Sequence, residues 1–324
     1  MRDSNGCRWT HPETILVATD LSDLDHLMPF ALEEAGDTGA RIILLHVLST
    51  TSAFTADAAG IPYYNTAGAL EIAEQMMHPW CEVAARLGIR CDSMAREGHP
   101  TQQIAAAVRQ FHADHVLLGT RSRGKLGRLL IGSVAEQVLR SVYLPVITVG
   151  PEAHLPVDRG EERVVLHATT LRETSRPSAA LACRIATERN ARLVLLHVLP
   201  PIEEVERRSL PPGMDEKAFQ QLRVLDAEQE LRLLAHETGA GCSTAVDQVV
   251  VEGNPSIEIL AEASSRQAGL IVLGSTDRSA LVNLTRDRTI YRVLAHARCP
   301  VITLREPLGP AAEAHPETAA SAHR

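Results

Sequence analysis

The residues of this chain that could bind a ligand gather in one glycine-rich, basic segment from Gly119 to Ser133. An apolar run precedes the segment and a helical sequence follows it, in the order strand, loop, helix. The backbone N–H groups of such a loop and of a helix start can bind an anion. Charged side chains that could add to this are Arg121, Arg123, Lys125 and Arg128. The segment therefore predicts a site for a phosphate-bearing ligand.

Plainer interpretations exist for the same residues. Glycines also serve ordinary turns, so a glycine-rich loop alone is weak evidence for a ligand. Asp20, which follows an apolar run, could be only a turn residue, and Ser22 could cap the next helix. His46 and His197 stand in apolar runs at matching positions and are expected to be structural, partly buried and hydrogen-bonded. The phosphate site gains weight only if Asp20 and the glycine-rich segment meet in the fold.

Enzyme chemistry finds little support in the sequence. The chain has no nucleophile elbow, no lysine-bearing Walker A pattern and no strongly paired carboxylates. Its fourteen histidines include no HExxH pattern, so no metal site is expected. A binding protein is therefore favoured over an enzyme.

The elements that must position these residues alternate between strand and helix. Five strands are expected in the first half, at Thr14–Thr19, Arg41–Leu48, Ile89–Arg96, His115–Leu118 and Val146–Val149. Helices are expected from Pro29, over Ala69–Leu87 with a kink or shortening at Pro79, over Thr101–His112 and over Ser133–Val142. Such an alternation predicts a parallel sheet covered on both faces. Ligands of such sheets bind at the carboxyl ends of the strands, where Asp20, Val47 and Gly119 lie.

The chain repeats this order of elements once. The offset between the copies is 150 residues at Ile15 and Val165 and 155 residues at Leu144 and Cys299. Two collinear copies predict an α/β fold of two tandem, doubly wound, parallel five-stranded sheets with helices on both faces. We expect a first domain over 1–150, a linker over 151–162, a second domain over 163–305 and a disordered tail over 306–324.

Composition excludes several classes of partner. The net charge of −8 and the 3% of aromatic residues argue against nucleic-acid binding, which needs a basic face and stacking platforms. No apolar run approaches the roughly 20 residues that span a bilayer, and the start lacks the apolar core of a signal peptide. The six cysteines show no metal-ligand spacing and are expected to be reduced. These observations predict a cytoplasmic protein that binds neither nucleic acid nor membrane.

These residues together resemble the universal stress protein family in its tandem form, over nearly the whole chain. Nucleotide-binding members have a first strand ending in Asp, a Leu-His-Val second strand and a G-x2-G-x9-G-[ST] motif before the last helix. Asp20, Val47, Gly119 and the pair Gly132-Ser133 match at the family's spacing. The second motif glycine is Ser122 here, which costs about 1 kcal/mol if a positive φ is required. Its hydroxyl could instead donate to a phosphate oxygen.

The resemblance implies a Rossmann-like fold of the adenine nucleotide alpha hydrolase type that binds ATP, with or without magnesium. Asp20 would accept a hydrogen bond from the adenine or ribose side, and the Val47 backbone would contact the adenine. The phosphates would lie on the loop and at the start of the helix after it. The nucleotide-binding residues implied are Ala18, where the family often has proline, with Asp20, Val47, Leu118, Gly119, Ser122, Gly132, Ser133 and Val134.

The second copy departs further from this pattern. Thr170 corresponds to Asp20, and Asp287 and Arg288 replace the Gly-Ser pair. A carboxylate there would repel a phosphate, and a Cβ would block close approach of the backbone. The second half is therefore expected to bind no triphosphate and to serve packing or signalling.

The function favoured by this resemblance is ATP-dependent regulation in the stress response, with one nucleotide per chain and an unidentified protein partner. Two alternatives stay open: a nucleotide-independent scaffold or chaperone-like protein, and a slow ATPase. The strands Val146–Val149 and Val301–Leu304 are expected to pair within the chain, which would remove two exposed sheet edges. The two halves would then form an intramolecular pseudo-dimer, and further homodimerisation stays open.

Overall fold

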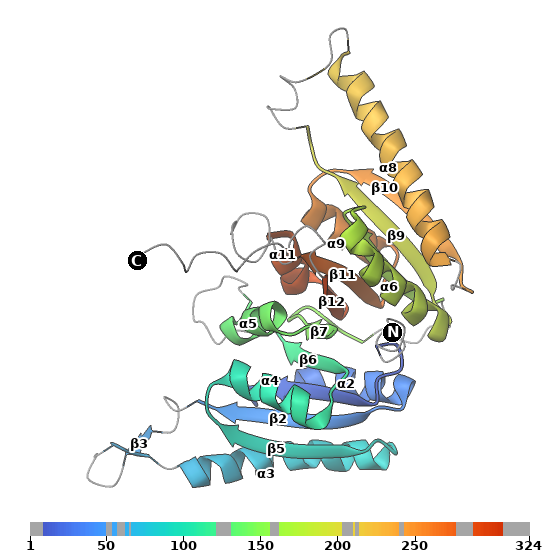
Figure 1. The fold of residues 1–324 in the computed structure, drawn as a ribbon. Coiled ribbons are helices and arrows are strands. Elements are labelled where there is room, and N and C mark those ends of the chain that lie inside the picture. Colours follow the sequence, from blue (N-terminus) through green and yellow to red (C-terminus); the bar gives the residue numbers. More distant parts are fainter. Residues whose placement is uncertain are drawn as a thin grey trace, which may run out of the picture.

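The computed structural model of the protein has the α/β fold that the sequence predicts, with a mainly parallel sheet between layers of helices (Figure 1). The structure describes residues 9–49, 54–56, 62–64, 66–120, 131–155, 162–202, 210, 214–239, 243–276 and 288–306. Most of the glycine-rich loop, its counterpart at 277–287 and the tail after 306 lie outside these residues. The roles expected of Ser122 and Asp287 therefore fall outside the described part of the chain.

The first half places its five parallel strands in the order β5-β2-β1-β6-β7. Their bounds are β1 (Thr14–Thr19), β2 (Arg41–Leu48), β5 (Cys91–Glu97), β6 (His115–Gly119) and β7 (Val146–Val149). A separate two-stranded sheet pairs β3 (Phe54–Ala56) with β4 (Pro62–Tyr64). The chain runs outward from β1 to β5 and then returns to the other side of β1. The strand order therefore reverses between β1 and β6, which is the switch point where ligands bind in such sheets.

Helices cover both faces of this sheet because buried side chains alternate along the strands. The bounds are α2 (Leu24–Thr38), α3 (Thr66–Arg86), α4 (Pro100–Phe111) and α5 (Ser133–Ser141). Ile15 and Val17 of β1 pack in the cluster that contains residues of α2 and α3. Leu16, between them, packs in the cluster of α4 and α5. The period of two along a strand thus produces one apolar core on each face.

Two helix expectations need correction at prolines. The first helix begins at Leu24, five residues before Pro29, and Pro29 lies inside it. The helix α3 continues for seven residues after Pro79 and is not shortened there. A proline inside a helix removes one N–H donor and clashes with the preceding turn, at a cost of about 3 kcal/mol or more that packing must offset. Met77 of α3, two residues before Pro79, is fully buried, and this packing holds the helix in place.

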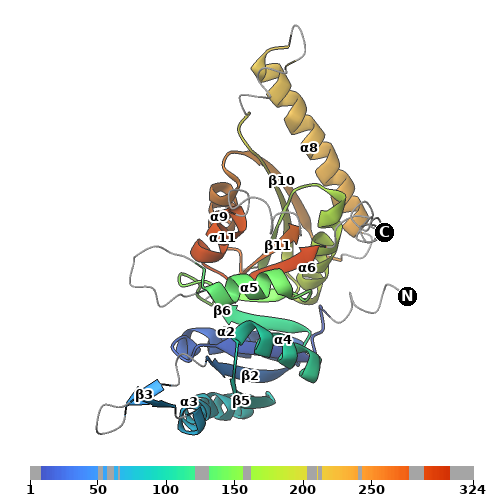
Figure 2. The ribbon, with the colours of Figure 1, turned by 60° about the vertical axis from the view of Figure 1, so that its left-hand side comes forward.

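The second half repeats the same strand order, β10-β9-β8-β11-β12. Its strands are β8 (Val164–Thr169), β9 (Arg192–Leu199), β10 (Val246–Glu252), β11 (Leu270–Thr276) and β12 (Val301–Glu306). Its helices are η2 (Glu173–Ser175, a 3-10 turn), α6 (Arg176–Glu188), α8 (Glu216–Gly239), α9 (Pro255–Ser265) and α11 (Arg288–His296). Figure 2 shows α8 projecting along the outer side of this half.

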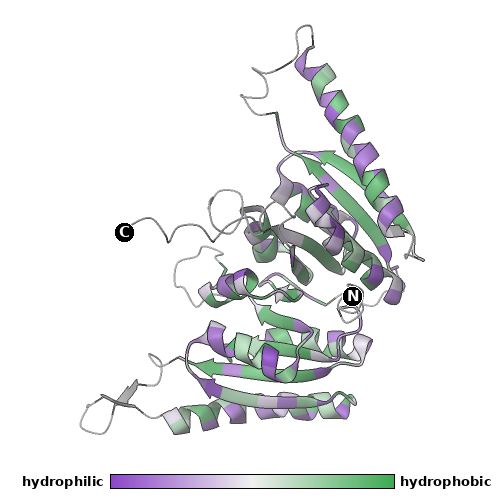
Figure 3. Ribbon diagram, viewed as in Figure 1, coloured by the Kyte–Doolittle hydropathy of each residue, from purple (hydrophilic) through white to green (hydrophobic). Residues whose placement is uncertain are grey.

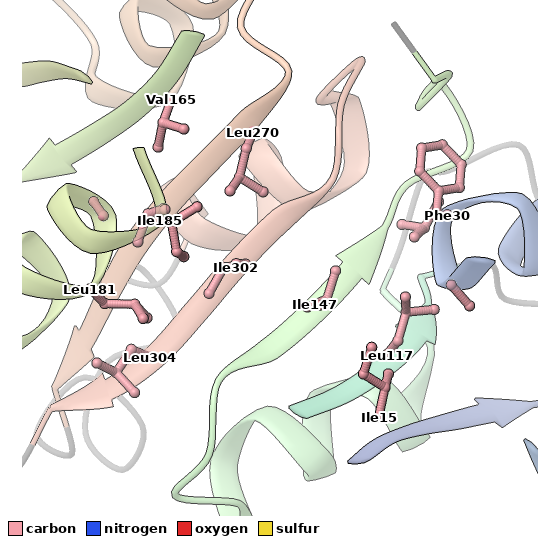
Figure 4. Packing of buried hydrophobic residues seen from close by; sticks show 14 of the residues in the cluster. Ile15, Phe30, Leu117, Ile147, Val165, Leu181, Ile185, Leu270, Ile302 and Leu304 are labelled. Carbon is pink, nitrogen blue, oxygen red and sulfur yellow. The ribbon is translucent and has the colours of Figure 1, made fainter. Parts of the chain in front are cut away.

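The two halves join through β7 and β12, which pair antiparallel and turn the two expected sheets into one ten-stranded sheet. Ile147 lies opposite Ile302, and both side chains are buried at the junction (Figure 4). The hydroxyl of Thr148 donates to the carbonyl of Val301 at 3.0 Å. The expected pairing of the last strands of the two copies is therefore confirmed.

Apolar residues fill the sheet and line the inner faces of the helices, as Figure 3 shows in green. Cys183 is disulfide-bonded, which corrects the expectation that every cysteine is reduced. Cys81, Cys91 and Cys299 are free thiols. None of the described helices is long and apolar enough to cross a membrane.

Candidate functional site

The strand register brings the predicted ligand residues of the first half to one edge of the sheet. Thr19 pairs with His46, and Ala18 pairs with Leu118. Asp20 follows Thr19 directly after β1, Val47 follows His46 on β2, and Gly119 follows Leu118 at the end of β6. These residues come from segments far apart in the sequence, and the fold sets them side by side at the switch point.

Several of these residues also share one face of the sheet. Leu118 belongs to the apolar cluster under α4 and α5, and Ala18 and Val47 pack against that cluster. The first turn of α5 begins at Ser133 on the same face, and Ser133 and Val134 are exposed. Ala18, Val47 and Leu118 thus share an apolar cluster with Ala135, which lies in the first turn of α5. An apolar wall beside an anion-binding end suits a ligand with a flat ring and a phosphate.

The two ends of the glycine-rich loop are held together. The backbone N–H of Gly132 donates to the carbonyl of Thr120 at 3.3 Å, and the N–H of Thr120 donates to Val149 at 3.2 Å. The loop therefore leaves β6 and enters α5 at one point. Gly132 is the N-cap of α5 and forms no side-chain capping bond, so capping leaves the first-turn N–H groups available. Within the described residues, the buried hydroxyl of Thr120 has no hydrogen-bond partner.

Asp20 lies in the turn after β1. Its Oδ1 accepts hydrogen bonds from the backbone N–H of Ser22 at 2.9 Å and from the Ser22 hydroxyl at 2.6 Å. The following residue, Leu21, has a φ of 73°. Asp20 is exposed, so the turn presents a carboxylate at the switch point. Asp20 can therefore stabilise the turn through Oδ1 and also bind a ligand. Ser22 does not cap the helix, because Asp23 is the N-cap of α2.

Asp23 is a buried carboxylate next to the site, and it belongs to none of the motifs in the sequence. It is 7% exposed, and its Oδ1 accepts a hydrogen bond of 2.6 Å from the Thr19 hydroxyl. Burial raises its pKa, the Thr19 bond lowers it, and the charge of Asp20 raises it further. Its Oδ2 lies 2.6 Å from the place where a Cβ on Gly119 would stand. Gly119 is therefore required for space beside Asp23, and the motif glycine has a packing reason.

The histidines at the strand ends are structural, as expected. His46 Nδ1 lies 3.0 Å from the Thr19 carbonyl, and His197 Nδ1 lies 2.9 Å from the Thr169 carbonyl. Both rings are partly buried. Each one ties the first strand of its half to the second strand.

In the second half, the turn after the first strand has a similar backbone conformation but different side chains. Leu171 has a φ of 59°, close to that of Leu21. Thr170 replaces Asp20, and its hydroxyl lies 2.9 Å from the hydroxyl of Ser175. Thr170 therefore presents no carboxylate at the position equivalent to Asp20.

A cavity of about 760 Å³ lies elsewhere, between the halves and near the amino ends of β8 and β11. It is lined on both sides by charged residues, among them Glu34, Asp37, Arg163 and Arg189. These four side chains form ion pairs with one another across the groove. The carboxyl-end site is the better candidate, because it lies at the switch point of the sheet and Asp20, Ser133 and Val134 are exposed. No cluster of three metal-ligating side chains occurs in the described part of the chain.

Comparison with known proteins gives a consistent result. The sequence profile of the universal stress protein family matches residues 12–150 and again residues 162–305. A universal stress protein of Mycobacterium tuberculosis is 30% identical over 197 residues, which cover 60% of this chain and 62% of that relative. The chain therefore spans about three fifths of that relative's length. A universal stress protein of Mycolicibacterium smegmatis is 26% identical over 306 residues, 90% of this chain and 96% of that protein.

The solved structures agree with the fold. The crystal structure of a universal stress protein from Archaeoglobus fulgidus matches with a TM-score of 0.65 at 21% identity, and the match covers 92% of this chain and 97% of that chain. A likeness at this level of identity speaks for the fold, including its two repeats.

Proposed function

The chain belongs to the universal stress protein family, and from that premise we propose that its first half binds one adenine nucleotide, ATP, as a regulatory ligand. The ligand occupies the carboxyl ends of β1, β2 and β6. The observation that carries the proposal is the strand register, which brings Asp20, Val47 and Gly119 to one edge of the sheet. The site would then offer the nucleotide a carboxylate, an apolar surface and the backbone N–H groups at the start of α5.

Each part of the nucleotide meets a matching group in this arrangement. The carboxylate of Asp20 accepts a hydrogen bond from the base or the ribose, because a carboxylate offers only acceptors when ionised. Val47 contacts the adenine through its backbone, and Leu118 and Gly119 pass under the ribose. Ser133 and the first N–H groups of α5 face the phosphates, and charge-assisted bonds of this kind are the strong ones. Magnesium, if it accompanies ATP, would be held mainly by the phosphates and water.

The second half is proposed to bind no triphosphate and to serve packing and signalling. Its turn carries Thr170 in place of Asp20, and this hydroxyl already contacts Ser175. In the sequence of the second half, Asp287 and Arg288 stand at the positions where the first half has Gly132 and Ser133. The binding of ATP then changes how ordered the nucleotide site of the first half is. A partner protein distinguishes the ATP-bound from the ATP-free state because it binds the two states with different affinities.

Calorimetric titration of the nucleotide-free chain with Mg-ATP tests this proposal, after a denatured sample has been checked for co-purified nucleotide. We expect saturation at one ATP per chain. Asp20→Ala should weaken binding about tenfold or more, because a hydrogen bond to a charged group contributes about 1.5 kcal/mol or more. Thr170→Ala is the matched control, since both positions are exposed and equivalent, and it should leave the affinity unchanged.

Other outcomes would contradict the proposal in distinct ways. Two sites per chain would mean that the second half also binds nucleotide. No saturation, with no nucleotide carried through purification, would favour a nucleotide-independent scaffold. Release of ADP during the titration would favour an ATPase.

A further inference from the structure

Two free thiols outside the nucleotide site lie in direct contact. The Sγ atoms of Cys81 in α3 and Cys91 at the start of β5 are 2.7 Å apart. This separation exceeds the length of a disulfide bond, about 2.05 Å, by only about 0.65 Å. The two residues come from different elements, so the fold itself brings the sulfurs together. Both residues are half-buried and β5 is an edge strand, so a small oxidant can reach them.

We propose that Cys81 and Cys91 are a peroxide-sensitive pair that forms a reversible disulfide. The bond fixes the last turns of α3 to the edge strand β5. This proposal rests on the contact between the two sulfurs and is independent of nucleotide binding.

The two cysteines have different roles in the proposed reaction. Hydrogen bonds from Cys91 and Ser93 hold the pKa of the Cys81 thiol below its ordinary value, against the effects of burial and of Asp92. The shared proton and burial raise the pKa of Cys91. Since the thiolate is the nucleophile, Cys81 is the attacking sulfur and Cys91 resolves the product.

The reaction balances with hydrogen peroxide as the oxidant. The Cys81 sulfur attacks one peroxide oxygen, the O–O bond breaks, and the leaving hydroxide takes a proton to become water. Cys81 is now a sulfenic acid. The Cys91 sulfur attacks the Cys81 sulfur, the S–S bond forms, and the S–O bond breaks. The departing oxygen leaves as a second water with the Cys91 proton. Two thiols have lost two electrons and two protons, and the peroxide has become two waters.

The other described cysteines provide internal comparisons. Cys299 is 4% exposed, and burial raises its pKa to about 12. It therefore has neither the access nor the thiolate character for this chemistry. Cys183 is already disulfide-bonded.

Mass spectrometry of the full chain tests the proposal. The reduced, desalted chain is treated with a small molar excess of hydrogen peroxide, denatured, alkylated and digested. We expect Cys81 and Cys91 to become protected from alkylation together, about tenfold or more faster than Cys299. A disulfide-linked peptide that contains both Cys81 and Cys91 should appear at the same time. Dithiothreitol should restore both labels. Full alkylation of the pair under these conditions, or a linkage of Cys81 to another cysteine, would overturn the proposal.

Two conservative variants check the order of attack. In Cys91→Ser, the Cys81 sulfenic acid should accumulate and react with dimedone, because no resolving thiol is present. In Cys81→Ser, Cys91 should keep its label. Equal peroxide reactivity of Cys91 in the absence of Cys81 would refute the assigned roles. The pair in the unaltered chain remains the primary measurement if either variant folds poorly.

Discussion

The carboxylate of Glu34 in α2 accepts a hydrogen bond of 2.6 Å from the guanidinium of Arg189, which follows α6 in the other half of the chain. Glu34 is nearly buried, with 10% of its side chain exposed, and its second oxygen lies 3.8 Å from Nδ1 of His115. Burial raises the pKa of Glu34, but the charges of Arg189 and His115 and the hydrogen bond from Arg189 together lower it more. The halves are therefore joined by a buried ion pair as well as by β7 and β12.

Glu34→Gln should lower the free energy of unfolding by about 3 kcal/mol, because Arg189 would lose the buried carboxylate that accepts its hydrogen bond. Urea denaturation measures this change. Glu162→Gln is the control, because it breaks an ion pair with Arg192 at the surface. The side chain of Glu162 is 50% exposed and that of Arg192 is 41% exposed. Such an exposed pair contributes about 1 kcal/mol or less. Equal effects of the two variants would show that the Glu34 contact has no special importance for the junction.

His167 should make the stability of the protein depend on pH in the acid range. Its ring is fully buried in β8, and Nδ1 lies 3.0 Å from the Val272 carbonyl. Within the described residues, Nε2 has no partner. Burial lowers the pKa of His167 from 6.5 to about 4. Between these values the unfolded chain binds a proton and the folded chain does not. Stability is therefore full above pH 6.5 and falls as the pH drops towards 4, by about 3 kcal/mol.

His167→Val should remove this contribution, because the equivalent residue of the first half is Val17 and the site suits an aliphatic side chain. Unfolding free energies at several pH values between 7 and about 4 measure the change. Some dependence should remain, since burial also lowers the pKa of His115. His78→Ala, at an exposed position of α3, should leave the pH profile as it was. An unchanged profile in His167→Val would contradict the prediction.

Gly119→Ala should destabilise the first half by about 1–2 kcal/mol, because the new Cβ would stand 2.6 Å from Oδ2 of Asp23. The cost should shrink in an Asp23→Ala background, with a coupling of about 1 kcal/mol in the double-mutant cycle. Gly36→Ala is the control. A Cβ there meets nothing within 4 Å, and alanine is the better helix former, so this variant should gain up to about 1 kcal/mol. Additive effects of the Gly119 and Asp23 changes would exclude a steric cause.

The sequence predicted the strands well because each is a buried apolar run with a clear end. The bounds of β1, β2 and β7 agree with the expectation residue for residue. The start of α2 differs from the expectation, because the helix begins at Leu24 and continues through Pro29. The junction was predictable because both last strands contain the sequence Pro-Val-Ile-Thr and would otherwise leave open edges.

The sequence predicts residues of the candidate site only where they belong to the family motif. Asp20 and Gly119 were found from their order along the chain. Asp23 was not, because its importance comes from a contact with Gly119, 96 positions further on, that only the folded chain creates. The contact between Cys81 and Cys91 depends in the same way on how α3 returns to β5.

Ser133→Ala should weaken the binding of ATP about tenfold and leave the free energy of unfolding unchanged. The hydroxyl stands at the start of α5, in an exposed position, so its loss removes a donor to phosphate without leaving a cavity. Titration calorimetry and urea denaturation of the same preparation separate the two effects. Ser141→Ala, at the other end of α5, is the matched control and should bind like the unaltered chain. Equal affinities for Ser133→Ala and the unaltered chain would place the phosphates away from this helix start.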